Sequence, residues 1–174
     1  MSTLILPHGG GELKPLLLTS PVLDEEIKKA QGLKKVPMTS RETGDLIMMK
    51  IGAFTPLDGF MGKDDGQGCC ETYSLPSRKG LFWPIPITLS ADKDLANSLA
   101  IGQEVALWDT ETESLMGTMK VTEKYTIDKE SECKRVFRTA DPAHPGVQKV
   151  MEQGPVNLAG PVKVISESYY PEMF

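Results

Sequence analysis

The chain has 174 residues, of which 40% are hydrophobic and 25% are charged, a composition ordinary for one globular domain. Its formal net charge of -5 leaves no excess of lysine and arginine to replace phosphate counterions, which argues against a general nucleic-acid binder. Its apolar runs are all shorter than the roughly 20 residues that a membrane span needs.

The beginning of the chain and its cysteines indicate the compartment. Residues 1–7 lack the basic region and long apolar core of a signal peptide. The cysteines are Cys69, Cys70 and Cys133, an odd number with two adjacent, which favours reduced thiols. We therefore expect a cytoplasmic protein.

Two helices are predicted in the first third of the chain. The first begins at Ser20-Pro21, a hydroxyl cap followed by proline, and stops at Gly32. The second begins with a capping box, Thr39-Ser40-Arg41-Glu42, in which the first and last side chains each bond the other's backbone amide. It runs to Lys50 and ends at Gly52, and we expect Leu46, Met49 and Ala53 to share one face.

The segment 51–62 combines glycines and a proline with large apolar side chains. Such a segment is typical of a loop pinned into the core. The predicted anchors are Phe54, Leu57, Phe60 and Met61. A polar turn is expected next, over residues 63–68.

Strands are predicted in the middle of the chain and near its end. Residues 83–89 alternate strictly, with prolines at 84 and 86, which indicates an edge strand. Residues 94–99 suggest a short helical or irregular connection. Residues 105–109 and 115–125 read as the two strands of a hairpin, and 161–165 as a last strand.

Two more helices are predicted between the hairpin and the last strand. Asp128 can cap a helix that reaches Phe137, and a further helix spans 146–153 with Gly154 as its stop. The aromatic tail, 169–174, should pack against another surface. This order of elements predicts an α+β fold with a small, barrel-like antiparallel sheet and flanking helices.

Residues that carry chemistry are scarce. The two histidines, His8 and His144, and the three cysteines have no metal-ligand spacing, so we expect no metal site, with Cys133 buried in a helix and Cys69-Cys70 near a loop. His144 follows Asp141, which would suit an acid–base pair, but a ring that bonds a backbone carbonyl and fixes the turn is favoured.

Two loop segments leave a choice between anion binding and a purely structural role. The glycines between 59 and 68 can form an anion-binding nest, although turn formation is favoured. The segment Ser77-Arg78-Lys79-Gly80 can contact an anion or RNA, or form a solvated hairpin tip, which is favoured. From its residues alone the chain shows no active site.

Six strings, taken together and in order, resemble the N-terminal domain of the ATP sulfurylase (sulfate adenylyltransferase) family. They are Pro7-His8-Gly9-Gly10; Thr39-Ser40-Arg41-Glu42 with Asp45-Leu46; the whole of 51–62; Trp83-Pro84-Ile85-Pro86-Ile87-Thr88-Leu89; Val136-Phe137-Arg138-Thr139; and His144-Pro145-Gly146-Val147. Gly160-Pro161-Val162 also fits. The resemblance implies a PUA-like domain, a small antiparallel pseudo-β-barrel with flanking helices, over residues 1–165.

The resemblance also implies the chemistry of the longer enzyme. That enzyme converts ATP and sulfate to adenylyl sulfate and pyrophosphate, or the reverse, with Mg-ATP bound by a following domain that carries Gln-Thr-Arg-Asn-Pro and a His-x-x-His pair. Neither motif occurs here. We therefore expect a non-catalytic N-terminal piece, with no catalytic, cofactor or metal residue, and residues 166–174 as the start of a linker to the catalytic domain.

The expected partners are the catalytic domain of the same polypeptide and further copies in a homo-oligomer, with no nucleic acid and no membrane. Whether Arg41, Arg78 or His144 comes near the active site of the intact enzyme stays open, as do its oligomeric state and the direction of its reaction. The alternative is a free-standing PUA-like module that binds RNA or a small ligand, against which the acidic balance speaks.

Overall fold

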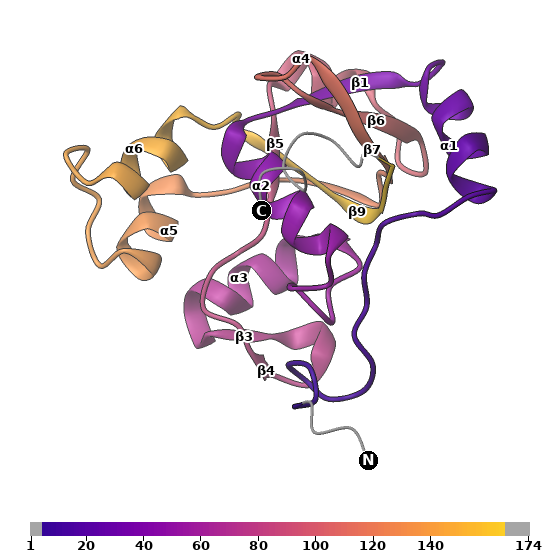
Figure 1. Ribbon diagram of the computed structural model, residues 1–174. Helices are drawn as coiled ribbons and strands as arrows, with labels where there is room; N and C mark the ends of the chain where they lie inside the picture. Colours follow the sequence, from indigo (N-terminus) through magenta and orange to yellow (C-terminus); the bar gives the residue numbers. More distant parts are fainter. Residues whose placement is uncertain (1–4, 166–174) are drawn as a thin grey trace. The chain divides into compact units, whose positions relative to one another are not determined.

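The computed structural model describes residues 5–165, shown in Figure 1, and these fall into two compact units. The described part of the first unit comprises 5–59, 103–120 and 161–165, and the second unit comprises 60–102 and 121–160. The helices are α1 (Val22–Ala30), α2 (Ser40–Lys50), α3 (Lys63–Thr72), α4 (Lys93–Ser98), α5 (Lys129–Val136) and α6 (Pro145–Glu152), with a 3-10 turn η1 (Pro76–Arg78). The strands are β1 (Lys34–Met38), β2 (Gly59–Phe60), β3 (Ser74–Leu75), β4 (Leu81–Phe82), β5 (Leu89–Ala91), β6 (Glu104–Asp109), β7 (Ser114–Lys120), β8 (Glu123–Thr126) and β9 (Val156–Val164).

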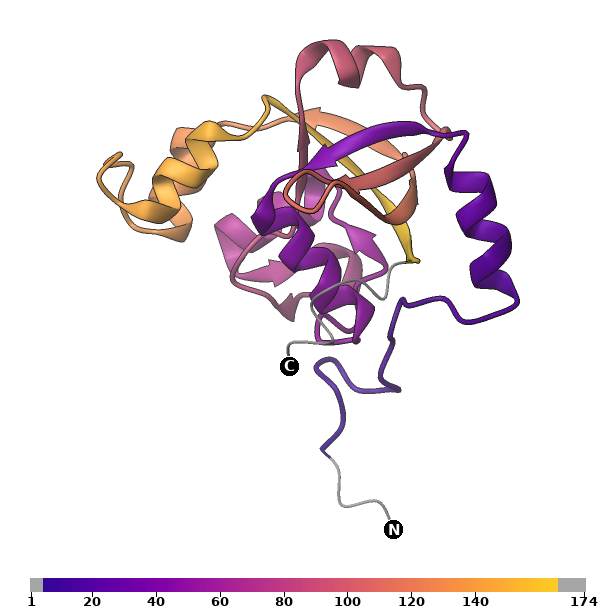
Figure 2. The same ribbon diagram turned by 45° about the horizontal axis from the view of Figure 1, so that its top comes forward.

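The first unit is built on the predicted hairpin, β6 and β7, whose antiparallel pairing is confirmed. Residues 162–164 of β9 extend the sheet beside β7, and β1 lies parallel to β6 on the other side, as Figure 2 shows. The sheet is therefore mixed, not purely antiparallel. Strand β1 was not predicted because its Lys34, Lys35 and Pro37 hide the apolar alternation. As the end strand of this sheet, it tolerates a proline.

Helix α2 follows the sequence signals closely. The Glu42 carboxylate accepts from the Thr39 amide at 2.8 Å, and the Thr39 hydroxyl accepts from the Glu42 amide, which completes the predicted capping box. Leu46 and Met49 are buried, but Ala53 is exposed because the helix has already ended at Lys50. The predicted shared face is therefore wrong at its last position.

Helix α1 forms where predicted but without the predicted cap. Pro21 occupies the N-cap position, so no side chain bonds the first amides, and the Ser20 hydroxyl is not the cap. The helix ends before Gly32, as expected. Its buried residues, Glu26 and Ala30, lie one turn apart on a single face.

The second unit holds β5 and β8, which pair antiparallel with residues 156–159 of β9 from either side. The predicted continuous strand over 83–89 is wrong, since only β4 before it and β5 at its end are regular strands. Pro84 and Pro86 cannot donate to a ladder, and Pro86 is buried while Ile85 is 53% exposed. The single strand predicted over 115–125 is also divided, because β7 ends at Lys120 and β8 begins at Glu123.

Helix α3 replaces the polar turn predicted for 63–68, and Cys69 and Cys70 lie within it rather than near a loop. Two acidic residues in its first turn favour its N-terminus, and its glycines permit close contacts. A Cβ at Gly68 would lie 2.6 Å from the Ser74 carbonyl oxygen. Because the glycines between 62 and 68 are part of this helix and its cap, the alternative of a glycine nest is not realised.

The remaining helices confirm the sequence predictions. Asp128 accepts from the Ser131 amide at 3.0 Å and caps α5. α4 occupies the short connection expected at 94–99. α5 packs on α6 around Cys133, which is fully buried as expected, in a cluster with Val147 and Val150. None of the helices described in residues 5–165 has the length and apolar character that crossing a bilayer requires.

The predicted anchors of the segment 51–62 are buried in three cases out of four. In the first unit Leu57 is 6% exposed, whereas Phe54 is only half-buried; in the second unit Phe60 and Met61 are each 3% exposed. The aromatic tail and the predicted linker, 166–174, lie outside the described residues, and the boundary at 165 stays a prediction.

Candidate ligand pocket of the second unit

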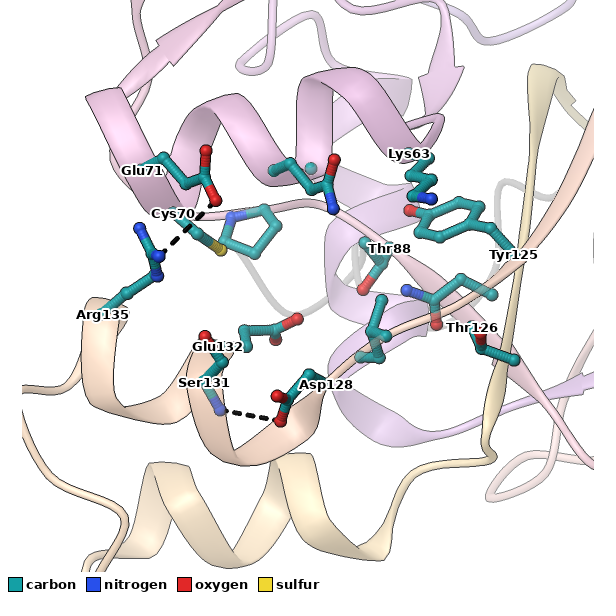
Figure 3. Close-up of a pocket in the computed structure, with 15 residues that line it drawn as sticks. Lys63, Cys70, Glu71, Thr88, Tyr125, Thr126, Asp128, Ser131, Glu132 and Arg135 are labelled. Carbon is teal, nitrogen blue, oxygen red and sulfur yellow. Dashed lines mark hydrogen bonds and ion pairs between the residues drawn. The ribbon is translucent and has the colours of Figure 1, made fainter.

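The second unit contains a cavity of about 100 Å³ that opens to the surface, shown in Figure 3. Its walls come from α3, from the segment before β5, from β8 with the turn after it, from the start of α5 and from β9. The lining residues are Lys63, Gly66, Gln67, Cys70, Glu71, Pro86, Thr88, Tyr125, Thr126, Ile127, Asp128, Ser131, Glu132, Arg135 and Asn157. All of them belong to this one unit.

Local interactions fix the two helical walls. The Asp128 cap sets where α5 begins, at the edge of the cavity, and an Arg135–Glu71 ion pair of 3.6 Å joins α5 to α3, as Figure 3 shows. Both members of this pair are about half exposed, so it contributes little to stability. The pair links α5 to α3 beside the cavity and adds little to the stability of the unit.

Tyr125 and Asn157 form a directly opposed pair on β8 and β9. The Tyr125 hydroxyl donates to the Met61 carbonyl oxygen at 2.9 Å, and burial raises the pKa of this phenol, although the nearby Asn157 amide acts in the opposite direction. The phenol therefore stays protonated at neutral pH and its proton is already engaged.

Asn157 is the most unusual residue of the cavity wall. Its side chain is fully buried between β5 and β8, yet neither Nδ2 nor Oδ1 makes a hydrogen bond of standard geometry with any described residue. Buried polar groups are nearly always paired, because an unpaired one loses its bonds to water without compensation. Neither amide atom is thus held by a hydrogen bond of standard geometry, although the amide interacts with the Tyr125 hydroxyl and acts to lower the pKa of that phenol.

The charged groups at the wall are mixed in sign. Three carboxylates (Glu71, Asp128 and Glu132) stand against the cations of Lys63 and Arg135. Burial, reinforced by the Glu132 carboxylate, raises the pKa of the Cys70 thiol to about 12. This cysteine is therefore a protonated, weak nucleophile at neutral pH. The wall offers groups suited to binding through hydrogen bonds.

The residues singled out in the sequence lie elsewhere. Arg41 bonds Asp45 at 2.8 Å within α2, in the first unit. Arg78 lies in the exposed η1 turn between β3 and β4, which confirms the solvated hairpin tip. His8 is exposed in the first unit. None of these residues lines the cavity.

His144 has the structural role that the sequence favoured. Its Nδ1 accepts from the Gly146 amide at 3.1 Å and caps α6, and its ring lies 5.1 Å from that of Phe137. The predicted bond to a carbonyl is therefore replaced by one from an N–H. Among the residues that the structure describes, no three His, Cys, Asp or Glu side chains gather closely enough to hold a metal ion.

Sequence reasoning missed the cavity and both members of the Tyr125–Asn157 pair. The available signal was weak: Asn157 is a lone amide in the mostly apolar segment 156–164, which also holds Lys163. Its unpaired state depends on the register between β8 and β9, which no local pattern fixes.

Comparison with known proteins gives consistent matches over the whole chain. The PUA-like domain family matches residues 5–167. The chain is 64% identical to the sulfate adenylyltransferase of Syntrophobacter fumaroxidans and 59% identical to that of Thiobacillus denitrificans, in each case over 100% of this chain and 42% of the relative. It thus spans less than half the length of these curated relatives.

A solved structure shares the fold. The hexameric APS kinase from Thiobacillus denitrificans matches with a TM-score of 0.70 and 22% identity, over 98% of this chain and 28% of that one. At this identity the likeness shows the fold alone. The family match confirms the predicted α+β class with a PUA-like pseudo-β-barrel, with the correction that the sheet is mixed.

Proposed function

The chain belongs to the PUA-like domain family, and on this premise we propose that it serves as the N-terminal, non-catalytic domain of a sulfate adenylyltransferase. The observation that carries the proposal is the 64% identity over the full chain to the Syntrophobacter fumaroxidans enzyme, of which the chain covers 42%. An identity this high over the full length of the chain supports the same role for it, as one part of a longer enzyme.

The proposed whole enzyme joins sulfate to the α-phosphate of ATP and releases pyrophosphate, or runs in reverse. Displacement at phosphorus requires cationic groups and oriented donors around the phosphates. This chain has neither a Gln-Thr-Arg string nor a His-x-x-His pair. We therefore assign the binding of Mg-ATP and sulfate to the remainder of the enzyme and give this chain no catalytic residue.

The proposed partners follow from that division. The chain packs on the catalytic domain of its own polypeptide, and the intact enzyme is a homo-oligomer. The structural neighbour is described as hexameric, but this is a property of that protein. Sedimentation of the intact enzyme would measure its number of subunits.

A first test uses the 174-residue chain alone with ATP, sulfate, magnesium and pyrophosphatase. We expect phosphate release at the level of a reaction without protein. Release above that background would refute the assignment of a non-catalytic role.

A second test asks whether this chain can replace its counterpart. A chimera would carry this chain in place of the matching part of the Syntrophobacter fumaroxidans enzyme. We expect it to form ATP from adenylyl sulfate and pyrophosphate at a rate comparable to the parent enzyme, which serves as the control. A folded but inactive chimera would contradict the proposal, because a domain of the same role should support the same catalytic domain.

A further inference from the structure

We propose that the cavity of the second unit binds a small neutral molecule that presents a hydrogen-bond donor and acceptor side by side, with Asn157 as the recognition group. Primary carboxamides and the lactam edges of pyrimidine bases share this chemistry. The inference rests on the cavity alone and does not depend on the proposed function.

The requirement for a donor and an acceptor together comes from the two amide atoms of Asn157. Nδ2 can donate and Oδ1 can accept, whereas the hydroxyl of the opposed Tyr125 gives its proton to the Met61 carbonyl and so cannot donate to Oδ1. A carboxylate would satisfy only Nδ2, and an ammonium group only Oδ1. A planar amide edge satisfies both atoms in one arrangement.

The charges of the wall favour a neutral molecule. Its three carboxylates outnumber its two cations, which disfavours an anion, while Arg135 is already paired with Glu71. Pro86 and Ile127 supply apolar surface beside the polar groups. Such a mixture, mostly contact surface with a few placed hydrogen-bonding groups, is typical of small-molecule sites.

The cavity is larger than a site for a single water molecule needs to be. One water requires roughly 10–15 Å³ of such volume, and the cavity has about 100 Å³. Asn157 is fully shielded from solvent, so a bound group reaches it after a side-chain adjustment. The terminal torsion of asparagine is broad and permits the amide to turn toward the cavity.

The test follows the side-chain amide signal of Asn157 by NMR while probes are added to the 174-residue chain. Acetamide presents the open carboxamide and uracil the ring lactam, so the two arms distinguish the two sources of this chemistry. N-methylacetamide is the matched negative probe, because its trans amide holds N–H and C=O on opposite sides. Acetate tests the preference against anions.

We expect saturable shifts of the Asn157 signal with acetamide or uracil, with a dissociation constant on the order of millimolar for so few contact atoms. Asn157→Leu should abolish saturation at the neighbouring backbone signals of Tyr125 and Thr126. Gln148→Leu removes an amide from the exposed face of α6 and should leave the binding unchanged.

Equal shifts with acetamide and N-methylacetamide would overturn the proposal, and so would saturation that survives Asn157→Leu. It is also overturned if no neutral probe saturates at about 10 mM, ten times a millimolar constant. The probe comparison uses the unaltered chain, so it decides the matter even if Asn157→Leu fails to fold.

Discussion

Phe60 has a large aromatic ring in a segment of turn-forming residues, and we expect burial of this ring to stabilise the fold. It is 3% exposed within the second unit. Phe60→Ala should lower the free energy of unfolding by about 3–5 kcal/mol, through lost burial and the cavity left behind. Urea denaturation followed by circular dichroism measures this loss.

Phe82→Ala is the matched control, because that ring is 61% exposed. We expect this substitution to change stability by about 0.5 kcal/mol or less. If the two variants lost the same amount of unfolding free energy, burial would not be the way in which Phe60 stabilises the fold.

Asp45 is predicted to make the first unit less stable as the pH rises. Burial raises the pKa of this carboxyl to about 6, although Arg41 at 2.8 Å acts against the shift. The folded chain then holds the proton more tightly than the unfolded chain. This stabilisation is complete below the ordinary aspartate pKa of 3.8 and is lost as the pH rises through about 6.

Asp45→Asn cannot ionise at this position and should lack that dependence. The stability of the variant relative to the unaltered chain should rise by up to about 3 kcal/mol between acidic and neutral pH. Urea denaturation across this range measures the difference, and Asp94→Asn, at an exposed carboxyl, is the control. A difference that does not vary with pH would contradict the raised pKa.

At the scale of elements, α3 depends on one of its two internal glycines. A Cβ on Gly68 would lie 2.4 Å from a Pro76 ring carbon and 2.6 Å from the Ser74 carbonyl oxygen. Gly68→Ala should therefore destabilise the chain by about 1–3 kcal/mol, since backbone must move. Thermal denaturation would show this as a lower melting temperature.

Gly66→Ala in the same helix is the matched comparison. Its Cβ would meet only the Tyr125 hydroxyl, at an ordinary 3.4 Å. Alanine is the better helix former by about 1 kcal/mol, so this variant should be as stable as the unaltered chain or more stable. If both alanines destabilise equally, close approach is not the reason for Gly68.

Helix α1 is tied to the sheet of the first unit by one buried carboxylate. Glu26 accepts from the Thr118 hydroxyl of β7 at 2.7 Å and from Lys163 of β9 at 3.0 Å, and pairs with Lys29 at 2.7 Å. Burial alone would raise its pKa, but these donors outweigh burial and hold the pKa at about 2. The stabilisation is present above the ordinary glutamate pKa of 4.5 and is lost as the pH falls through about 2.

Glu26→Gln should cost about 1.5–3 kcal/mol at neutral pH, the range for hydrogen bonds to a charged group. The deficit should shrink as the pH falls toward 2, because the unaltered carboxyl becomes neutral too. Glu25→Gln, on the exposed side of the same helix, should have little effect. A deficit that persists at low pH would indicate a packing cause instead.

The elements that the sequence predicted are those whose signals are local. α2 and α5 are capped by Thr39 and Asp128, whose side chains accept from amides three residues on, so both caps can be read from spacing alone. α3 was missed because Gly68, which reads as a turn residue in the sequence, serves a close approach to Pro76 and Ser74 that only the folded unit creates. The Asn157 site was missed for the same reason.

At the scale of the whole molecule, the charge balance bears on the alternative of an RNA-binding module. The chain has 19 lysines and arginines against 24 aspartates and glutamates. Several of the basic groups are already paired, including Lys29 with Glu104 and Arg135 with Glu71. Affinity for a phosphate backbone requires cations that release counterions, and the surplus needed for this is lacking.

A gel-shift series with a structured RNA tests this balance. We expect no retained complex at micromolar chain concentrations between about 50 and 200 mM salt, the range over which phosphate-driven affinity changes most. A complex that forms at low salt and weakens steeply across that range would show that basic side chains gather into a functional surface despite the net charge. That result would show that the chain binds RNA, and its proposed place in an enzyme would then not be its only role.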